Sequence, residues 1–498
     1  MNITFDVSSV EDYARFLRVK QLPQYRIQGR SAWFPDEYAS LLGVEAEPEA
    51  DDGYEAPSWM FDYQRAITAI AIKKRRFALF WDCGLGKTAT ILEFARVARD
   101  DLRRSDRGVL IVSPLMVVPQ TMREAAKFYG DGNYDIEPVK SSELADWCRS
   151  CGGKIGITNY DAFSGHDYDR GKVGALILDE SSMLKSHYGK WATRLLAWGA
   201  GLKWKLCATG TPAPNDRIEY ANHAVFLGQF PSVNSFLATY FVNRGQTQER
   251  WVLKPHALRP FYRALSHWCV FLTDPSVYGW HDNCDNIPPI HVHIESVDMT
   301  DEQQRLARQH TGELFANTMG GITGRARLGQ IGKGFFKGAK IASNKTAHIK
   351  ALLESWPDES TLVWCKYNAE QDDLANYLPG AASISGATKL DERFRLIDGF
   401  LSGDIRTLIT KPKILGFGLN LQIATRQIFS GLEDSFETYY QAVKRSNRYG
   451  STRPLNVHIP VTDIEEPLVQ NVLRKAHRVE ADTREQELLF REAAVYQQ

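Results

Sequence analysis

The stretch FALFWDCGLGKTATILEFA, from Phe77 to Ala95, decides the fold. A compact apolar run leads into a glycine turn and then a segment of helical character, which predicts a buried strand, a loop and a helix. The turn ends in the Gly-Lys-Thr of a phosphate-binding loop, although Trp81 stands where such a loop has its first glycine. Backbone N–H groups beside Gly84 and Gly86 would converge on phosphate at the helix N-terminus. The sequence therefore predicts a nucleotide site, with Leu85 between the two glycines.

Catalytic side chains are expected beside this loop. Lys87 would reach the β- and γ-phosphates, and the Thr88 hydroxyl would hold Mg²⁺. A second apolar run, GALILDESS (174–182), ends in Asp179, a ligand for the metal, and Glu180, which would orient or deprotonate the attacking water. Ligands of parallel sheets bind at the carboxyl ends of the strands. The two motifs together predict a nucleotide triphosphatase.

Compact apolar runs recur in two series along the chain. The first holds FALFW, GVLIVSP, KIGITNY, GALILDE and WKLCATGTP, and the second holds TLVWCKY, AASISG, TLITKP, RQIFSG and LNVHIPV. Apolar runs without alternation indicate strands buried on both faces, and hence parallel α/β sheets. We expect an N-terminal accessory segment and linker (1–58), a first α/β lobe (59–215), a helical insertion with a basic interlobe linker (216–345), a second lobe (346–466) and a C-terminal helical tail (467–498).

The overall amino-acid composition excludes few classes of function. Lys plus Arg and Asp plus Glu number 60 each in 498 residues, so any basic surface must be local. No N-terminal apolar segment resembles a signal peptide, and no apolar run approaches the roughly 18 residues that span a bilayer. The seven cysteines, an odd number, are typical of a reducing compartment. We expect a cytoplasmic protein, or a nuclear one in a eukaryote, and a monomer because no heptad seam is present.

The motifs resemble those of the superfamily 2 helicases, specifically the Swi/Snf-type ATPases. WDCGLGKT matches the second half of the family's D-E-M-G-L-G-K-T, and the family also lacks the first glycine. FDYQ is similar to the element in which Gln64 would read the adenine edge, which implies ATP. ATGTPAPN matches the third motif, where Thr209 and Thr211 would couple the ATP and nucleic-acid sites. The resemblance implies two tandem RecA-like domains.

The second lobe carries the remaining motifs. GFGLNLQ resembles the fifth motif, and QAVKRSNRYGS is close to the sixth, Q-A-x-x-R-x-x-R-x-G-Q. In the family's pattern Arg448 would be the arginine finger, Arg445 a second γ-phosphate contact and Gln441 a coupling residue. An arginine finger contributes about 10³–10⁵ in rate, so hydrolysis would require closure of the two lobes.

The chain departs from the family at three places. The box Asp-Glu-x-His reads DESS, so Ser182 replaces the histidine that usually links this box to the third motif. Ser451 replaces the final glutamine of the sixth motif, and KILGFG departs from the small residues of the fifth. None of these changes removes a catalytic group. They bear on how strongly hydrolysis depends on nucleic acid.

Nucleic acid is expected to bind through phosphates, without sequence specificity. From Leu314 to Leu353 there is no Asp or Glu among several Lys and Arg, which favours a phosphate track over a merely solvated linker. The matched motifs add further contacts. The predicted nucleic-acid residues are Ser113, Pro114, Thr158, Asn159, Arg325, Arg327, Lys333, Lys337, Thr410 and Asn420.

Three functions remain open. The leading one is a motor that steps along DNA, most simply double-stranded, using ATP and Mg²⁺, with RNA and an unidentified protein partner left open. The second is a helicase that separates the strands of branched DNA or RNA, for which 216–345 would have to supply a wedge. The third is an ATP-gated clamp with little turnover. The altered box DESS supports this function, whereas the presence of Glu180, Arg445 and Arg448, which hydrolysis would need, argues against it.

Overall fold

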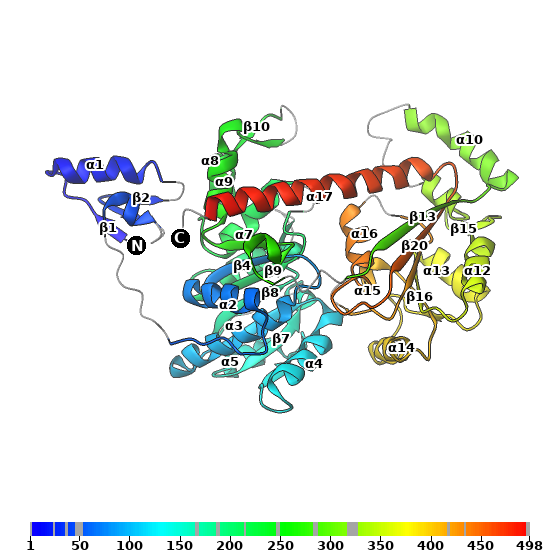
Figure 1. The fold of residues 1–498 in the computed structure, drawn as a ribbon, viewed down its shortest axis with the longest axis horizontal. Helices are drawn as coiled ribbons and strands as arrows, with labels where there is room; N and C mark the ends of the chain where they lie inside the picture. Colours follow the sequence, from blue (N-terminus) through cyan, green and yellow to red (C-terminus); the bar gives the residue numbers. More distant parts are fainter. Residues whose placement is uncertain are drawn as a thin grey trace. The chain divides into compact units, whose positions relative to one another are not determined.

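The computed structural model describes residues 2–22, 25–34, 38–44, 53–164, 169–185, 190–213, 216–245, 250–281, 287–315, 327–415, 419–432 and 435–494. The chain forms two compact units, each with its own parallel sheet (Figure 1). The first comprises residues 1–82, 86–282 and 482–498, and the second residues 83–85 and 283–481. Two parallel sheets flanked by helices are the predicted pair of RecA-like lobes.

Seven parallel strands form the sheet of the first unit, in the order β12-β4-β9-β8-β5-β7-β6. Almost every residue of the central strands is buried, because helices cover both faces, which is why their sequences do not alternate. The strands are β4 (Arg76–Trp81), β5 (Gly108–Ser113), β6 (Ile136–Pro138), β7 (Ile155–Asn159), β8 (Val173–Asp179), β9 (Trp204–Thr209) and β12 (Cys269–Leu272).

Helices of the first unit cover this sheet and extend beyond it. Of these, α2, α3 and α4 pack directly against strands (Figure 1). Their bounds are α2 (Asp62–Lys74), α3 (Lys87–Leu102), α4 (Val118–Tyr129), α5 (Leu144–Ser150), α6 (Lys190–Gly199), α7 (Tyr220–Phe226), α8 (Val233–Tyr240) and α9 (Leu258–Leu265).

The N-terminal segment folds as a small element of its own. Strands β1 (Asn2–Thr4), β3 (Ser31–Trp33) and β2 (Arg26–Gln28) form an antiparallel sheet, and α1 (Val10–Val19) shares its apolar core. The expected linker ends at residue 58. Directly after it, the Trp59 ring stacks on the ring of Phe128 in α4, with 4.6 Å between the ring centroids. The chain is therefore anchored on the first unit before α2 begins.

Six parallel strands form the sheet of the second unit, in the order β13-β20-β19-β16-β18-β17. They are β13 (Ile290–Ser296), β16 (Thr361–Trp364), β17 (Ala382–Ser383), β18 (Thr407–Thr410), β19 (Arg426–Phe429) and β20 (Leu455–Val461). The helices are α10 (Asp301–Phe315), α12 (Lys345–Ser355), α13 (Asn368–Tyr377), α14 (Leu390–Ser402), α15 (Pro412–Leu415) and α16 (Phe436–Val443), and β14 (Phe335–Phe336) and β15 (Ala339–Lys340) form a hairpin.

The segment 216–345 differs from the expected insertion. It does contain α7 to α10, but β12 pairs with β4 in the first sheet and β13 pairs with β20 in the second. A further hairpin, β10 (Phe241–Asn243) with β11 (Trp251–Leu253), lies between α8 and α9. The segment is thus divided between the two units. Its strands were overlooked because β12 is only four residues long and β13 lies at a sheet edge with mostly exposed side chains.

The last helix, α17 (Glu466–Ala494), begins in the second unit, and its residues from 482 onward belong to the first. There the Phe490 ring lies 5.3 Å from that of Phe271 in β12. Glu487 accepts a hydrogen bond from the backbone N–H of Thr273 at 3.0 Å. Across the described part of the chain, no helix combines the length and apolarity needed to cross a bilayer.

Candidate active site

The phosphate-binding loop lies between β4 and α3, as predicted. Gly86 precedes the first residue of α3 and has φ +70°, in the left-handed region that glycine tolerates best. Gln64 of α2 lies directly against it, because a Cβ added to Gly86 would overlap Gln64 Nε2. Gln64 is almost fully buried, and its Oε1 accepts a hydrogen bond from Phe61 N at 3.0 Å. The predicted adenine-reading residue and the phosphate loop are therefore neighbours.

Lys87 is held in the loop by uncharged groups. Its ammonium donates to the backbone carbonyls of Trp81 at 3.0 Å and Asp82 at 3.2 Å. Carbonyls orient the side chain without neutralising it, so its charge remains available for phosphate. Trp81 itself is buried at the end of β4, where its carbonyl takes part in this arrangement in place of a glycine. Thr88 follows as the second residue of α3.

Two carboxylates lie at the end of β8, in the same sheet. Both Asp179 and Glu180 are buried. Burial and the neighbouring charge of Glu180 raise the pKa of Asp179 to about 7, while the Lys87 ammonium and a hydrogen bond from Ser113 pull it down. Because β4 and β8 both pair in parallel with β9, the loop after β4 and the carboxylates at the end of β8 lie at the same edge of the sheet. A buried carboxyl group that is easier to protonate than usual is a group that a divalent cation would stabilise.

The backbone at Glu180 is strained. Its φ is +51°, and a non-glycine residue in the left-handed region costs of order 1–3 kcal/mol unless its surroundings hold it. One support is Tyr160, whose hydroxyl donates to the Asp179 carbonyl at 2.7 Å from below the same turn. Such strain clusters at functional sites, which agrees with a catalytic role for Glu180.

Residues of the third motif follow β9, the neighbour of β8. Asp179 is in register with Ala208, so Thr209 ends its strand at the same edge as the carboxylates. Thr209 is buried, and its hydroxyl accepts a hydrogen bond from the backbone N–H of Thr211 at 3.2 Å. The predicted coupling residues Thr209 and Thr211 thus lie in one turn, next to the Asp179–Glu180 box.

The sixth motif is ordered within the second unit. Gln441 lies in α16 and Arg445 in the turn after it, both nearly fully buried. Arg445 Nε donates to the Gln441 carbonyl at 3.1 Å, and the Arg445 carbonyl accepts from Leu421 N at 2.9 Å. Arg448 follows one turn later and is half-buried. The fifth and sixth motifs are therefore joined through the backbone of Arg445.

Several residues predicted to contact nucleic acid are buried instead. Ser113 is fully buried and donates to Asp179 Oδ2 at 3.0 Å, so it belongs to the carboxylate site. Thr158 and Thr410 are also buried, and the Thr410 hydroxyl donates to the Ile384 carbonyl at 3.0 Å. Burial leaves these three side chains without access to phosphate in this structure, and a contact of these residues with nucleic acid stays a prediction.

Other residues of that prediction remain accessible. Pro114, Asn159 and Asn420 are half-buried, and the Asn159 side chain accepts from Asp161 N at 2.9 Å, where it caps a short helical turn. Arg327 is half-buried as well. Arg325 lies outside the described residues.

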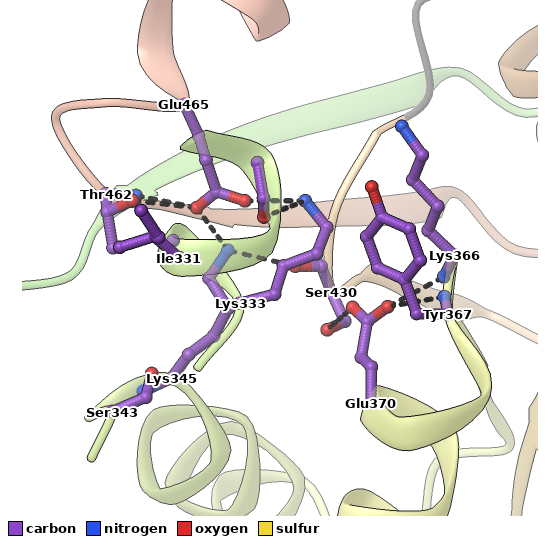
Figure 2. Close-up of polar contacts among 12 residues, drawn as sticks. Ile331, Lys333, Ser343, Lys345, Lys366, Tyr367, Glu370, Ser430, Thr462 and Glu465 are labelled. Carbon is purple, nitrogen blue, oxygen red and sulfur yellow. Dashed lines mark hydrogen bonds and ion pairs between the residues drawn. The ribbon is translucent and has the colours of Figure 1, made fainter. Parts of the chain in front are cut away.

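The basic stretch is split between interior and surface. Lys333 and Lys345 are buried and bind the two oxygens of Glu465 at 2.7 and 2.5 Å (Figure 2). Burial lowers the pKa of both ammonium groups and Glu465 raises it, and the balance leaves Lys333 above and Lys345 below the usual value for lysine. Lys333 is therefore an internal ion-pair residue, and its predicted phosphate contact is wrong for this structure. Lys337 is exposed, with its ammonium 5.4 Å from the centre of the Phe336 ring.

Family comparisons agree with this site. The model of the SNF2-related domain matches residues 56–306, and that of the helicase conserved C-terminal domain matches residues 344–450. The matched segments contain the phosphate loop, the carboxylate box and the third motif in the first case, and the fifth and sixth motifs in the second.

Individual relatives are more distant. The Drosophila melanogaster SWI/SNF-related matrix-associated actin-dependent regulator of chromatin subfamily A-like protein 1 is 21% identical over 433 residues, 84% of this chain and 55% of that protein. The DNA 3'-5' helicase XPB of Mycobacterium tuberculosis is 39% identical over 77 residues, 16% of this chain and 14% of that protein. The chain thus spans about half or less of the length of these curated relatives.

Among solved structures, the Sulfolobus solfataricus SWI2/SNF2 ATPase core in complex with dsDNA aligns over 89% of this chain and 97% of that chain, with 18% identity and a TM-score of 0.39. The family assignment does not depend on that alignment. It depends on the SNF2-related model, which covers half of the chain, and on the phosphate loop and carboxylate box that the sheet brings together. The chain belongs to the SNF2-related family of superfamily 2 ATPases.

Proposed function

We propose that this protein is an ATP-driven motor that steps along duplex DNA without reading its sequence. The observation that carries the proposal is the pairing of β4 and β8 with the same strand, β9, which brings the phosphate loop after β4 and the acids Asp179 and Glu180 after β8 to one edge of the first sheet. A lysine for phosphate and two acids with separate roles are what nucleotide hydrolysis needs. The family and the order of its motifs support DNA as the track. ATP and DNA occur together in cytoplasm and nucleus, which fits the expected location.

Each residue at this edge would have a distinct role. Gln64 would select adenine, and the loop from Gly84 to Gly86 with Lys87 would bind the phosphates. Glu180 would orient the attacking water and accept its proton. Asp179 and Thr88 are placed to hold Mg²⁺, which would neutralise charge on the phosphates when bound.

The second unit would complete hydrolysis. Arg448 is proposed to stabilise the charge that develops on the transferred phosphoryl group, with Arg445 beside it and Gln441 coupling the two. Thr209 and Thr211 would relate this event to DNA contacts in the first unit. Because the motor needs only the backbone of its track, contacts from residues such as Lys337 would suffice for binding.

ATP hydrolysis measured alone and with duplex DNA, single-stranded DNA and RNA tests the proposal. Strong stimulation by duplex DNA, abolished in Lys87→Ala and Glu180→Gln, is the expected result. Both variants should keep the thermal unfolding temperature of the wild type within a few degrees. Absence of turnover with every nucleic acid, while ATP still binds, would exclude a motor and leave the ATP-gated clamp.

A strand-separating helicase is the second candidate, and the β10–β11 hairpin favours it. Val242 of β10 is 37% exposed, and a hairpin that carries an exposed apolar side chain is an element that can separate base pairs. Displacement of a labelled strand from a forked duplex, compared with displacement of a bound protein from intact duplex, distinguishes the two. Displacement of the protein alone would identify a translocase.

A further inference from the structure

The residues after Glu180 show how the altered carboxylate box is held. Ser181 and Ser182 are both buried and begin a short 3-10 helix, Ser181–Lys185. Ser182 occupies the position where the resemblance expects the histidine that links this box to the third motif. This chain must therefore make that link in another way.

Ser181 makes the link through a histidine from elsewhere in the chain. Its Oγ lies 3.0 Å from Nε2 of His223, a fully buried residue of α7 that follows Ser181 by 42 positions. Burial raises the pKa of the Cys207 thiol in β9, and a hydrogen bond with Ser181 opposes that rise. Cys207 precedes Thr209 by two residues in the same strand. Ser181 thus connects the box, the third-motif strand and α7.

A second side chain of α7 supports the same turn. Asn222, next to His223, donates through Nδ2 to the backbone carbonyl of Leu184 in the 3-10 helix. The His223 ring also packs edge-on against Phe80 of β4, with centroids 5.2 Å apart. One short helix therefore contacts the strand before the phosphate loop and the turn after the catalytic acid.

The neutral form of the His223 imidazole fits its position beside Ser181. Burial lowers the pKa of His223 to about 4. At pH 7 the ring can bind the Ser181 hydroxyl without adding positive charge near Glu180. The contact therefore restrains the turn without adding a charge, and Lys87 is the cation that acts on the acid Asp179.

We propose that His223 is a positioning residue for ATP hydrolysis, which holds Glu180 in its strained backbone conformation through Ser181 and replaces the missing box histidine. The proposal rests on the proposed ATPase function. His223 does not touch the reacting atoms. Its effect is to keep the water-orienting acid in place and to join it to the strand that carries Thr209.

Variants at the contact test the proposal through a split between kcat and KM. His223→Ala and Ser181→Ala should each lower kcat for DNA-stimulated hydrolysis by about 10- to 100-fold, the scale expected when a catalytic group is misplaced by about an ångström. KM for ATP and the affinity for a non-hydrolysable ATP analogue should stay within about twofold. The double variant should lose little more than either single one, because both break one contact. His223→Gln, whose amide can bind the Ser181 hydroxyl, should recover most of kcat.

Phe226→Leu is the matched control. Phe226 is also buried in α7, and its ring packs beside Gly199 and Lys205. This variant should lower the thermal unfolding temperature as much as His223→Ala and keep kcat. Wild-type kcat in His223→Ala, or an equal loss in Phe226→Leu, would overturn the positioning role and leave the ATPase intact. If the wild type hydrolyses no ATP, the proposed function fails and this inference fails with it.

Discussion

Ser113 Oγ donates a hydrogen bond to Asp179 Oδ2 at 3.0 Å, joining the ends of two adjacent strands in the first sheet. From the motifs, Ser113 was predicted to contact nucleic acid and Asp179 to bind the metal. The hydrogen bond therefore joins two residues for which the sequence predicts different roles. The serine hydroxyl stabilises the charged form of the acid, in opposition to burial and to Glu180. The proposed metal site would therefore include Ser113 of β5, the strand that pairs with β8.

Replacement of Ser113 by Ala should weaken the site for Mg²⁺. The pKa of Asp179, already raised to about 7, should rise further, so protons compete better with the metal at neutral pH. We expect the Mg²⁺ concentration for half-maximal ATPase to increase by about 3- to 10-fold at pH 7. The defect should shrink as pH rises above 8, because Asp179 is then ionised in both proteins. Mg²⁺ titrations of ATPase at three pH values measure this.

The same variant decides between the two roles of Ser113. Affinity for duplex DNA should remain that of the wild type, and Ser113→Thr should retain the Mg²⁺ response. Weakened DNA binding with an unchanged Mg²⁺ requirement would instead restore the nucleic-acid role.

Replacement of Gly86 by Ala should abolish ATP binding. The added Cβ meets Gln64 Nε2, and the left-handed backbone adds strain. Gly201→Ala is the control, because Gly201 has φ +74° with open space around it. That variant should cost about 1 kcal/mol of stability and leave nucleotide binding unchanged. Binding of a fluorescent ATP analogue by both variants makes the comparison, and equal loss in both would show that strain alone is responsible.

Salt dependence of DNA binding should separate Lys337 from Lys333. Exposed Lys337 is proposed to contact phosphate, so Lys337→Ala should reduce the slope of log affinity against log salt by about one. Buried Lys333 pairs with Glu465, so Lys333→Met should lower stability and keep the slope. The affinity is measured with one duplex at four salt concentrations. A reduced slope for Lys333→Met alone would place that lysine on the DNA surface.

Acid should weaken the buried ion pairs of the second unit. Burial raises the pKa of Glu465, but Lys333 and Lys345 outweigh it and lower the value to about 2. Its contribution to stability is therefore complete above about pH 4.5 and declines as pH falls toward 2. Glu465→Gln should be less stable than the wild type by about 3–5 kcal/mol at pH 7, because two buried ammonium groups lose their partner.

Urea unfolding of the wild type and this variant between pH 7 and pH 3 gives the pH dependence. The difference between them should narrow below pH 4.5. Glu466→Gln, a change at the adjacent exposed residue, should behave like the wild type. A difference that stays constant to pH 3 would show that the ion pairs are not its source.

Most of the buried strands could be predicted from the sequence. The ten runs of the two series correspond to β4, β5, β7, β8, β9 and to β16 to β20, because residues buried on both faces leave a continuous apolar pattern. Of the strands at the edges of the two parallel sheets, β6, β12 and β13 were not predicted, whereas β17 was. β13, with the sequence IHVHIES, has mostly exposed side chains, and its place in the sheet depends on pairing with β20, which is 165 residues away at Ile290 and Leu455.

Some residues of the candidate site could be predicted from the sequence, and others could not. Those of the phosphate loop and the box could be located because their chemistry depends on local spacing. His223 gave no signal, since one histidine in a short helix is common and its contact with Ser181 exists only in the folded chain. Lys333 was misjudged for the same reason. Its acidic partner, Glu465, lies 132 residues farther along, beyond the stretch that is free of acids.

The end of α17 has a consequence for synthesis. Thr273 and its partner Glu487 are separated by 214 residues, all of which must leave the ribosome before the contact can form. Domains generally fold as their residues emerge, N-terminal first, at about 5–20 residues per second. The first unit therefore waits at least about ten seconds with the surface around Phe271 uncovered. During that interval this surface is available to a chaperone, and truncation of the last helix would make the exposure permanent.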